Sequence, residues 1–204
     1  SDTMLVKPMQ VNQCLSFIGN IMASRISSLW DFSGPSFTLS AQENSTFKAL
    51  EVAQMLLAEN QVDAVVVGAV DLAGGVENVL LRQQMASINT GKSTLSFDRN
   101  VNGWTVGEGA GAVVVKRLDR AKQSQDRIYA AIDAISVIQA NSTSEPIESL
   151  PQPPQAKAVT QACQKAFQTA GIKPEDIGYL EVFGSGVSQE DEAEVRGLLQ
   201  AYQT

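Results

Sequence analysis

Two uninterrupted apolar runs place the strongest constraint on how this chain can fold. Residues 64–70 read AVVVGAV, and residues 109–118 read GAGAVVVKRL, which is apolar as far as Val115; neither run alternates between apolar and polar side chains up to that point. A strand that is apolar on both faces is typical of a sheet covered on both sides, and most such sheets are largely parallel. We therefore expect a mostly parallel sheet whose strands are buried on both faces.

Helical spacing of apolar side chains predicts three helices around this sheet. They span residues 11–30, 43–59 and 156–170. Runs rich in β-branched and aromatic residues predict further strands, the last of which enters a glycine-rich turn. These strands span residues 37–41, 128–138 and 177–183. A helix that feeds a buried strand in each half of the chain indicates an α/β sandwich with right-handed crossovers.

Composition excludes several functional classes. The formal net charge is -7, which argues against a general affinity for nucleic acid. The chain has no histidine, and Cys14 and Cys163 lie far apart without a CxxC spacing, so we expect no metal site and interpret both thiols as packed side chains. No apolar run reaches the length of a membrane span and no signal peptide is recognisable, so we expect a cytoplasmic protein without a membrane span.

Three segments, in this order, resemble the β-ketoacyl synthase family. They read GPSFTLSAQENSTFKAL (residues 34–50), FDRNVNGWTVGEGAGAVVVKRL (residues 97–118) and YLEVFGSG (residues 179–186). The resemblance implies an α/β protein with a thiolase-like, layered α/β/α fold, present only in part as the end of the first half and the start of the second half. A proline-rich segment with four prolines separates the two parts and is expected to be a loop. The predicted division is residues 1–140, 141–155 and 156–204.

The family's catalytic positions are altered in this sequence. The alignment of the GPS segments places Glu43 where the family has the cysteine that carries the acyl chain, and Phe183 where it has a catalytic histidine. A carboxylate cannot form a useful acyl thioester, and a phenyl ring offers no hydrogen-bond donor for developing charge. Ser185 keeps a hydroxyl at a position where the family contacts phosphopantetheine. The catalytic set is therefore expected to be lost.

The resemblance and these losses together predict a non-catalytic, ketosynthase-like domain of a fatty-acid or polyketide synthase. Such a domain pairs with an active ketosynthase, as chain-length factors do, and shapes acyl-chain length or docks acyl carrier protein. The expected partners are a second ketosynthase-type chain, in a homodimer or heterodimer, and acyl carrier protein. Phosphopantetheine would be a transient ligand, and no covalently bound cofactor is expected. The dimer strand implied by the family consists of Phe37, Thr38, Leu39 and Ser40.

Other interpretations remain open at this point. Glu43 could serve an unusual acyltransferase or a malonyl decarboxylase, or it could only complement the dipole of the helix that follows. The chain could also be a pseudo-ketosynthase scaffold next to an acyltransferase domain. The glycines of residues 103–111 are interpreted as structural, and the acidic run at residues 189–194 as the solvated start of a helix.

Overall fold

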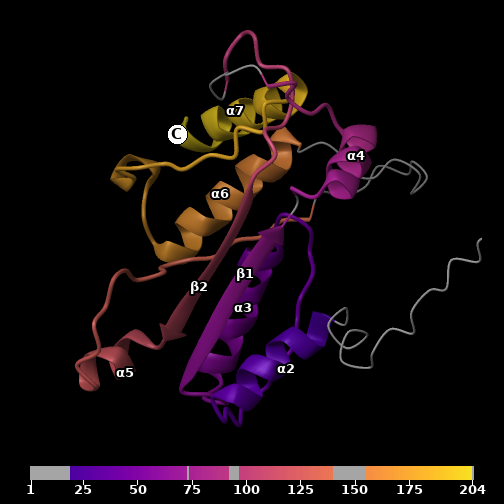
Figure 1. Cartoon of the computed structure of the whole chain (residues 1–204). Coiled ribbons are helices and arrows are strands. Elements are labelled where there is room, and N and C mark those ends of the chain that lie inside the picture. The colour runs from indigo at the N-terminus through magenta and orange to yellow at the C-terminus, as the bar shows by residue number, and fades with distance from the viewer. Residues whose placement is uncertain (1–18, 73, 92–96, 140–154, 204) are drawn as a thin grey trace, which may run out of the picture.

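The computed structural model describes residues 19–72, 74–91, 97–139 and 155–203. Figure 1 shows a two-stranded sheet with helices around it. In chain order the elements are α2 (Gly19–Leu29), α3 (Ser45–Ala58), β1 (Ala64–Leu72), α4 (Val76–Met85), β2 (Glu108–Lys116), α5 (Leu118–Gln123), α6 (Ala156–Ala170), the 3-10 helix η1 (Pro174–Asp176) and α7 (Ser188–Tyr202). The three expected helices are confirmed as α2, α3 and α6. Residues 11–18, Cys14 and most of the proline-rich segment lie outside the described residues.

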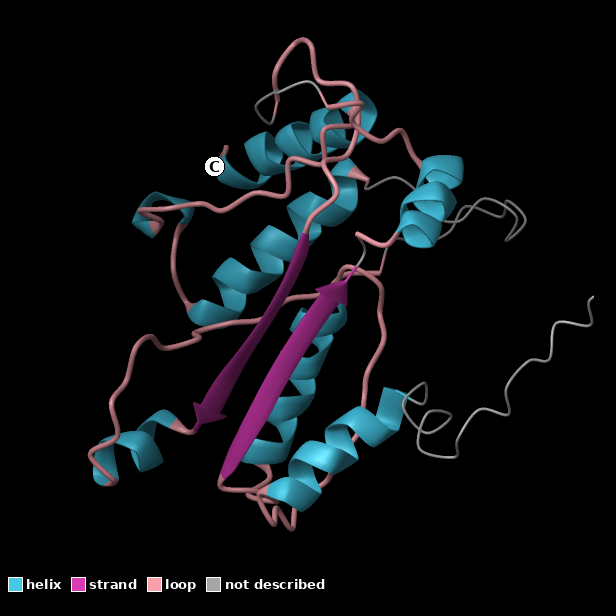
Figure 2. Cartoon of the chain, viewed as in Figure 1, coloured by secondary structure: helices cyan, strands magenta, loops and turns pink. Residues whose placement is uncertain are grey.

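The expectation of a mostly parallel sheet is wrong for the two strands that form. β1 and β2 pair antiparallel over their whole lengths, from Ala64 opposite Lys116 to Leu72 opposite Glu108. The reason lies in the connection between them, which keeps α4 near the end of β1, so β2 starts at the end where β1 stops (Figures 1 and 2). A parallel pair would require this connection to cross back along the whole sheet.

The strands are also less buried than their apolar runs predict. Among the described residues, α3 covers one face of β1 and buries Val67, which is only 6% exposed. On the rest of the ribbon Val66, Val70 and Val114 keep large exposed fractions, up to 71% for Val114. The side chains suit a sheet with two covered faces, but the described elements supply a layer on one face only. The expectation of burial on both faces is therefore wrong here.

Three expected strands do not form within the described residues. Residues 37–41, 128–138 and 177–183 carry no ladder hydrogen bonds, because no partner strand lies beside them in this part of the chain. Conversely, α4 and α5 were not expected, since both lie in segments that read as polar connections or as the continuation of a strand. No helix among the described residues has the length and apolar character needed to cross a bilayer.

A second compact unit is formed by α6 and α7. Phe167 and Tyr202 meet edge to face with their ring centroids 5.3 Å apart, and the Thr160 hydroxyl donates a hydrogen bond to the Gly197 carbonyl at 2.9 Å. A Cβ atom on Gly197 would lie 2.6 Å from both the Ala156 carbonyl oxygen and the Val159 Cβ. The absence of a side chain at residue 197 is what lets the two helices approach each other.

We predict that Gly197→Ala lowers the free energy of unfolding by about 1–3 kcal/mol, because forced overpacking outweighs the helix propensity that alanine gains. The measurement is denaturant unfolding of the purified protein. Gly178→Ala is the matched control, since nothing lies within 4 Å of the position that its added methyl group would take and its backbone is not left-handed. Equal stability of the Gly197 variant and the parent would contradict this account of the helix pair.

Candidate functional site

Glu43 lies in a tight turn that leads into α3. The turn is closed by Ser45, whose hydroxyl accepts a hydrogen bond from the Ala41 N–H at 2.9 Å and donates one to the Gln42 carbonyl. Gln42 has a φ of +53°, a left-handed conformation that is uncommon for a residue with a side chain. The local geometry is a strained elbow, and Glu43 follows the strained residue.

The Glu43 side chain is exposed and stands just before Asn44, the N-cap of α3. No hydrogen bond or ion pair joins its carboxylate to another residue in the described part of the chain. A general base is normally oriented by a second polar group, and Glu43 lacks such a group here. An acidic side chain at this end of a helix is compatible with the helix dipole.

The segment expected to pair with a second ketosynthase-type chain is attached to α2. Thr38 donates its backbone N–H to the Asn20 side-chain oxygen at 3.0 Å and its hydroxyl to the Gly19 carbonyl at 2.7 Å. Phe37 remains half-exposed, with 48% of its surface accessible. The role of Phe37, Thr38, Leu39 and Ser40 in a dimer stays a prediction.

Phe183 belongs to an aromatic and ionic chain of contacts. Its ring meets the Trp104 ring edge to face, with centroids 6.4 Å apart and an interplanar angle of 69°. The Arg82 guanidinium lies 4.7 Å from the centroid of the same Trp104 ring, and it also contacts the Asp71 carboxylate at 3.6 Å. Such ring and cation contacts are each worth about 0.5–1.5 kcal/mol. The side chain at residue 183 is therefore part of a packing arrangement.

The backbone on either side of this ring is held by Glu194 of α7. One carboxylate oxygen accepts the Phe183 N–H at 2.7 Å, and the other accepts the Gly184 N–H at 2.9 Å. Hydrogen bonds to a charged acceptor are stronger than neutral ones, contributing about 1.5–3 kcal/mol each. Both N–H groups are occupied in this structure, so they are not available to a ligand.

Ser185 is buried, with 6% of its surface exposed, and its hydroxyl faces the protein. It donates to the Asp191 carboxylate at 3.2 Å and accepts the Val187 N–H at 3.1 Å. The same Asp191 oxygen accepts the Gly186 N–H. A contact between Ser185 and phosphopantetheine stays a prediction.

The interpretation of residues 189–194 as a solvated helix start is wrong for two of its members. Asp191 is 6% exposed and Glu194 is half-buried, because both carboxylates turn back to bind the N–H groups of the preceding loop. Glu192 faces solvent, as that interpretation predicted, and it also pairs with Arg196. The spacing of three residues between Asp191 and Glu194 places them on one helix face, which was the signal in the sequence that could have identified them.

Two glycines join the segment before β2 to the loop before α7. The Gly103 N–H donates to the Gly186 carbonyl at 2.9 Å, and a Cβ atom on Gly186 would lie 2.6 Å from the Gly103 oxygen. Gly103 has a φ of +126°, and its Cβ atom would lie 2.4 Å from the Ser87 oxygen. Gly186 has a φ of +82°. Neither position accommodates a side chain, so the glycines here are structural, as expected.

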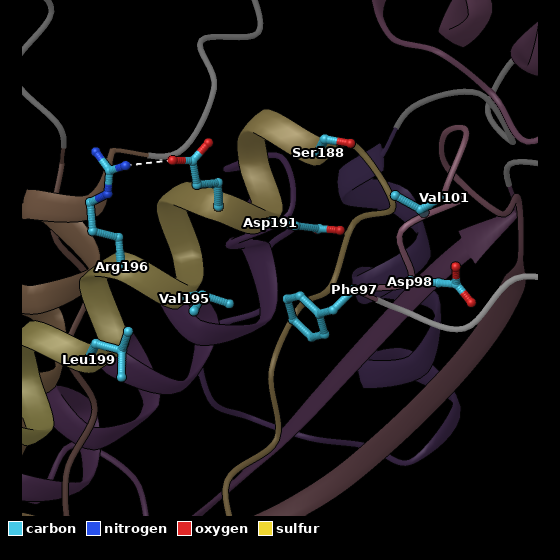
Figure 3. Close-up of a pocket in the computed structure, with 9 residues that line it drawn as sticks. Phe97, Asp98, Val101, Ser188, Asp191, Val195, Arg196 and Leu199 are labelled. Carbon is cyan, nitrogen blue, oxygen red and sulfur yellow. Dashed lines mark hydrogen bonds and ion pairs between the residues drawn. The ribbon is translucent and has the colours of Figure 1, made fainter.

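A cavity of about 420 Å³ lies beside this joint, between α7 and the segment before β2. Figure 3 shows Phe97 and Val195 at its wall, with the Asp98 carboxylate on the far side. Apolar side chains and carboxylates share the lining, and the one arginine in it is paired with Glu192. Within the described ranges the lining holds no thiol or lysine, and no group of acidic or sulfur side chains there could bind a metal ion.

Cys163, the described cysteine, lies on α6 away from the elbow. Burial raises the pKa of its thiol, so the thiolate is a smaller fraction at neutral pH than in a free cysteine. Burial likewise raises the pKa of the neighbouring Tyr202. No contact joins Cys163, Glu43 and Phe183 among the residues that the structure describes. Sequence reasoning did not identify Trp104 and Glu194, which contact residue 183, or Arg82, which contacts the Trp104 ring; the Phe183 residue itself stays 57% exposed.

We predict that Glu194→Gln destabilises the protein by about 1–3 kcal/mol. The glutamine amide keeps one acceptor oxygen, but its NH2 group is a donor and cannot accept the second backbone N–H. The measurement is denaturant unfolding. Glu192→Gln is the matched control on the same helix, where loss of an exposed ion pair should change stability by less than about 1 kcal/mol. Equal effects of the two substitutions would argue against the role of Glu194.

We predict that iodoacetamide alkylates Cys163 more slowly than it alkylates the free thiol of glutathione at pH 7.5. The reason is that burial raises the pKa of the Cys163 thiol and restricts access to it. The rate should still be rising with pH above the range where glutathione levels off. Peptide mapping separates Cys163 from Cys14, and urea-unfolded protein provides the control. Alkylation faster than that of glutathione would instead identify an activated nucleophile.

Comparison with known proteins places these features in a family. The Beta-ketoacyl synthase N-terminal domain matches residues 2–121, and the Beta-ketoacyl synthase C-terminal domain matches residues 129–204. A subunit of the polyunsaturated fatty acid synthase of Thraustochytrium sp. is 43% identical over 121 residues, 59% of this chain and 6% of that protein. Polyketide synthase PksL of Bacillus subtilis is 30% identical over 183 residues, 90% of this chain and 4% of that protein.

Solved structures also match this chain to ketosynthases. The structure described as PfaC Keto synthase-Chain length factor has a TM-score of 0.77 and 43% identity, over 95% of this chain and 19% of that chain. The ketosynthase from module 6 of the bacillaene synthase of Bacillus subtilis has a TM-score of 0.83 and 29% identity, over 91% of this chain and 33% of that chain. The chain thus spans a small part of the curated relatives and about a third of a ketosynthase. It belongs to the β-ketoacyl synthase family and has part of the thiolase-like ketosynthase fold.

Proposed function

We propose that this chain is part of a ketosynthase-like domain that does not condense acyl groups itself and that serves a polyunsaturated fatty-acid or polyketide synthase as a chain-length factor. The observation that carries the proposal is the side chain at residue 183. The resemblance aligns Phe183 with the family's histidine; in the structure its ring meets Trp104 edge to face, and Glu194 accepts its backbone N–H.

The nucleophile is the first missing component. A ketosynthase holds its acyl chain as a thioester, which needs a thiolate at the elbow. Glu43 at that position would form an acyl anhydride, which water hydrolyses. Cys163 cannot substitute, because it lies on α6 and burial raises the pKa of its thiol.

The hydrogen-bond donor for developing negative charge is the second missing component. A phenyl ring has no N–H group, and the nearest backbone donors, those of Phe183 and Gly184, are bonded to Glu194. Decarboxylation of a malonyl group develops enolate charge that needs such a donor. The exposed Glu43 carboxylate would also repel the malonyl carboxylate if the two came close. These two electrostatic arguments weigh against the decarboxylase and acyltransferase hypotheses for Glu43.

The scaffold around the altered positions is preserved, which favours a retained structural role over a domain that has lost all function. A chain-length factor completes a dimer with an active ketosynthase and borders its acyl channel. The description of the PfaC structure names a ketosynthase together with a chain-length factor, and that chain is 43% identical to this one. We infer the same kind of partner, with Phe37, Thr38, Leu39 and Ser40 at the contact and acyl carrier protein as a transient partner that presents phosphopantetheine.

We predict that the synthase containing this chain acquires no covalent acyl group on residues 1–204 when it is supplied with acyl and malonyl carrier protein. Peptide mass spectrometry measures the acyl group, and released carbon dioxide measures decarboxylation. The partner ketosynthase, with its cysteine intact and with it replaced by alanine, provides the positive and background controls.

Glu43→Gln separates the hypotheses in the same assays. The proposal predicts unchanged turnover of the synthase, because Glu43 takes no part in bond formation. A fall in turnover of about 100-fold or more, as expected on removal of a general base, would establish an enzyme that uses Glu43. An acyl group on Glu43 would do the same.

A further inference from the structure

The loop at residues 183–187 is closed by hydrogen bonds within the protein. Four of its five backbone N–H groups donate to side chains of this chain, namely those of Phe183, Gly184, Gly186 and Val187. The acceptors are the Glu194 carboxylate, the Asp191 carboxylate and the Ser185 hydroxyl. A loop that binds a ligand through its backbone uses N–H groups that are free to point at that ligand. This loop has already used most of its donors.

The Ser185 hydroxyl is bonded within the protein both as a donor and as an acceptor. It donates its one hydrogen to Asp191 Oδ1 at 3.2 Å and accepts the Val187 N–H at 3.1 Å. Ser185 is only 6% exposed, and additional chain packed at this place could only bury it further. A ligand would therefore reach this hydroxyl only after the loop had opened.

The Asp191 carboxylate opposes such an opening. Asp191 lies in the first turn of α7 and is only 6% exposed (Figure 3). Its Oδ1 accepts both the Ser185 hydroxyl and the Gly186 N–H, whereas its Oδ2 has no partner within the described residues. Loss of a further donor would leave a buried charge with a single hydrogen bond, which is strongly unfavourable.

The chemistry of the pantetheine arm does not compensate for that loss. The arm offers neutral amide groups, and a hydrogen bond to a neutral acceptor is about half as strong as one to a carboxylate. A Ser185 hydroxyl that turned from Asp191 to an amide carbonyl of the arm would exchange the stronger bond for the weaker one. The contact with Asp191 is therefore favoured.

The neighbouring residues offer the arm no substitute contact within the loop. The Gly186 carbonyl accepts the Gly103 N–H at 2.9 Å, and a Cβ atom on Gly186 would lie 2.6 Å from the Gly103 oxygen. The segment before β2 thus lies directly against the loop. The Val187 side chain has no polar atom, and the next hydroxyl along the chain, that of Ser188, already belongs to α7.

We propose that the loop at residues 183–187 is closed to phosphopantetheine, so that the arm of an acyl carrier protein bypasses it and enters the partner ketosynthase. The resemblance predicted a contact between Ser185 and this arm, and the bonds of Ser185 argue against that contact. Ser185 instead ties the loop to α7 through Asp191. The proposal rests on the proposed function for the presence of a partner ketosynthase, whereas the closure of the loop rests on the contacts above.

Photo-cross-linking in the complete synthase tests the closure of the loop. The probe is acyl carrier protein whose phosphopantetheine carries a diazirine beside its amide groups, which on illumination reacts with whatever the arm touches. The expected result, mapped by peptide mass spectrometry, is a label on the partner ketosynthase and a yield on residues 179–191 of this chain that is at least about tenfold lower. A yield on those residues within tenfold of that on the partner would overturn the proposal.

Ser185→Ala provides a second test, with Ser188→Ala as its matched control. The closed loop predicts that Ser185→Ala lowers the denaturant midpoint, because Asp191 and Val187 each lose a partner. Ser188 is exposed and its hydroxyl has no partner in the described part of the chain, so Ser188→Ala should leave the midpoint unchanged. Equal midpoints of the two variants would contradict the role of Ser185 in closing the loop.

The KM of the synthase for its acyl carrier protein substrate separates a structural serine from one that binds the arm. The closed loop predicts the same KM for folded Ser185→Ala, Ser188→Ala and the parent. A rise of about threefold or more with Ser185→Ala alone, as expected on loss of a hydrogen bond to the arm, would overturn the proposal.

Failure of this inference is distinguishable from failure of the proposed function. A label on residues 179–191 without an acyl group on this chain refutes the closed loop and leaves the proposed function standing. An acyl group on this chain with no label on those residues refutes the proposed function and leaves the closed loop standing.

Discussion

The close approach of Gly103 and Gly186 is the contact on which the described site depends. It joins the segment matched by the N-terminal family model to the segment matched by the C-terminal one through a backbone hydrogen bond of 2.9 Å, with no room for a side chain on either residue. Trp104 follows Gly103 and Phe183 lies three residues before Gly186, so the same contact brings their rings together. Any side chain at either glycine would separate the two segments.

The described contacts around residue 183 hold the loop before α7 in place. Phe183 contributes a ring to Trp104, and Glu194 and Asp191 hold the loop around it through backbone N–H groups. Carboxylates at the start of α7 also complement its dipole, so the loop and the helix stabilise each other. The arrangement belongs to the part of the ketosynthase fold that this chain covers.

Local patterns in the sequence predicted the helices better than the sheet. α6 was expected at residues 156–170 and ends there, because its apolar spacing and Gly171 are both local signals. The relative direction of β1 and β2, and the burial of their faces, depend on elements that are distant in sequence. An apolar run alone therefore could not reveal that the two strands pair antiparallel or that Val114 is exposed. The positions of Glu43 and Phe183 followed from motif resemblance, whereas the contacts of Phe183 with Trp104 and Glu194 needed three dimensions.

A double-mutant cycle between Trp104 and Phe183 tests most directly whether residue 183 now serves packing. The unfolding free energies of the parent, the two single leucine variants and the double variant define the coupling between the rings, with synthase turnover measured on each folded variant. The account predicts a favourable coupling of about 0.5–1.5 kcal/mol, and turnover that follows the amount of folded protein. Zero coupling, together with lost turnover in a fully folded Phe183→Leu variant, would contradict it.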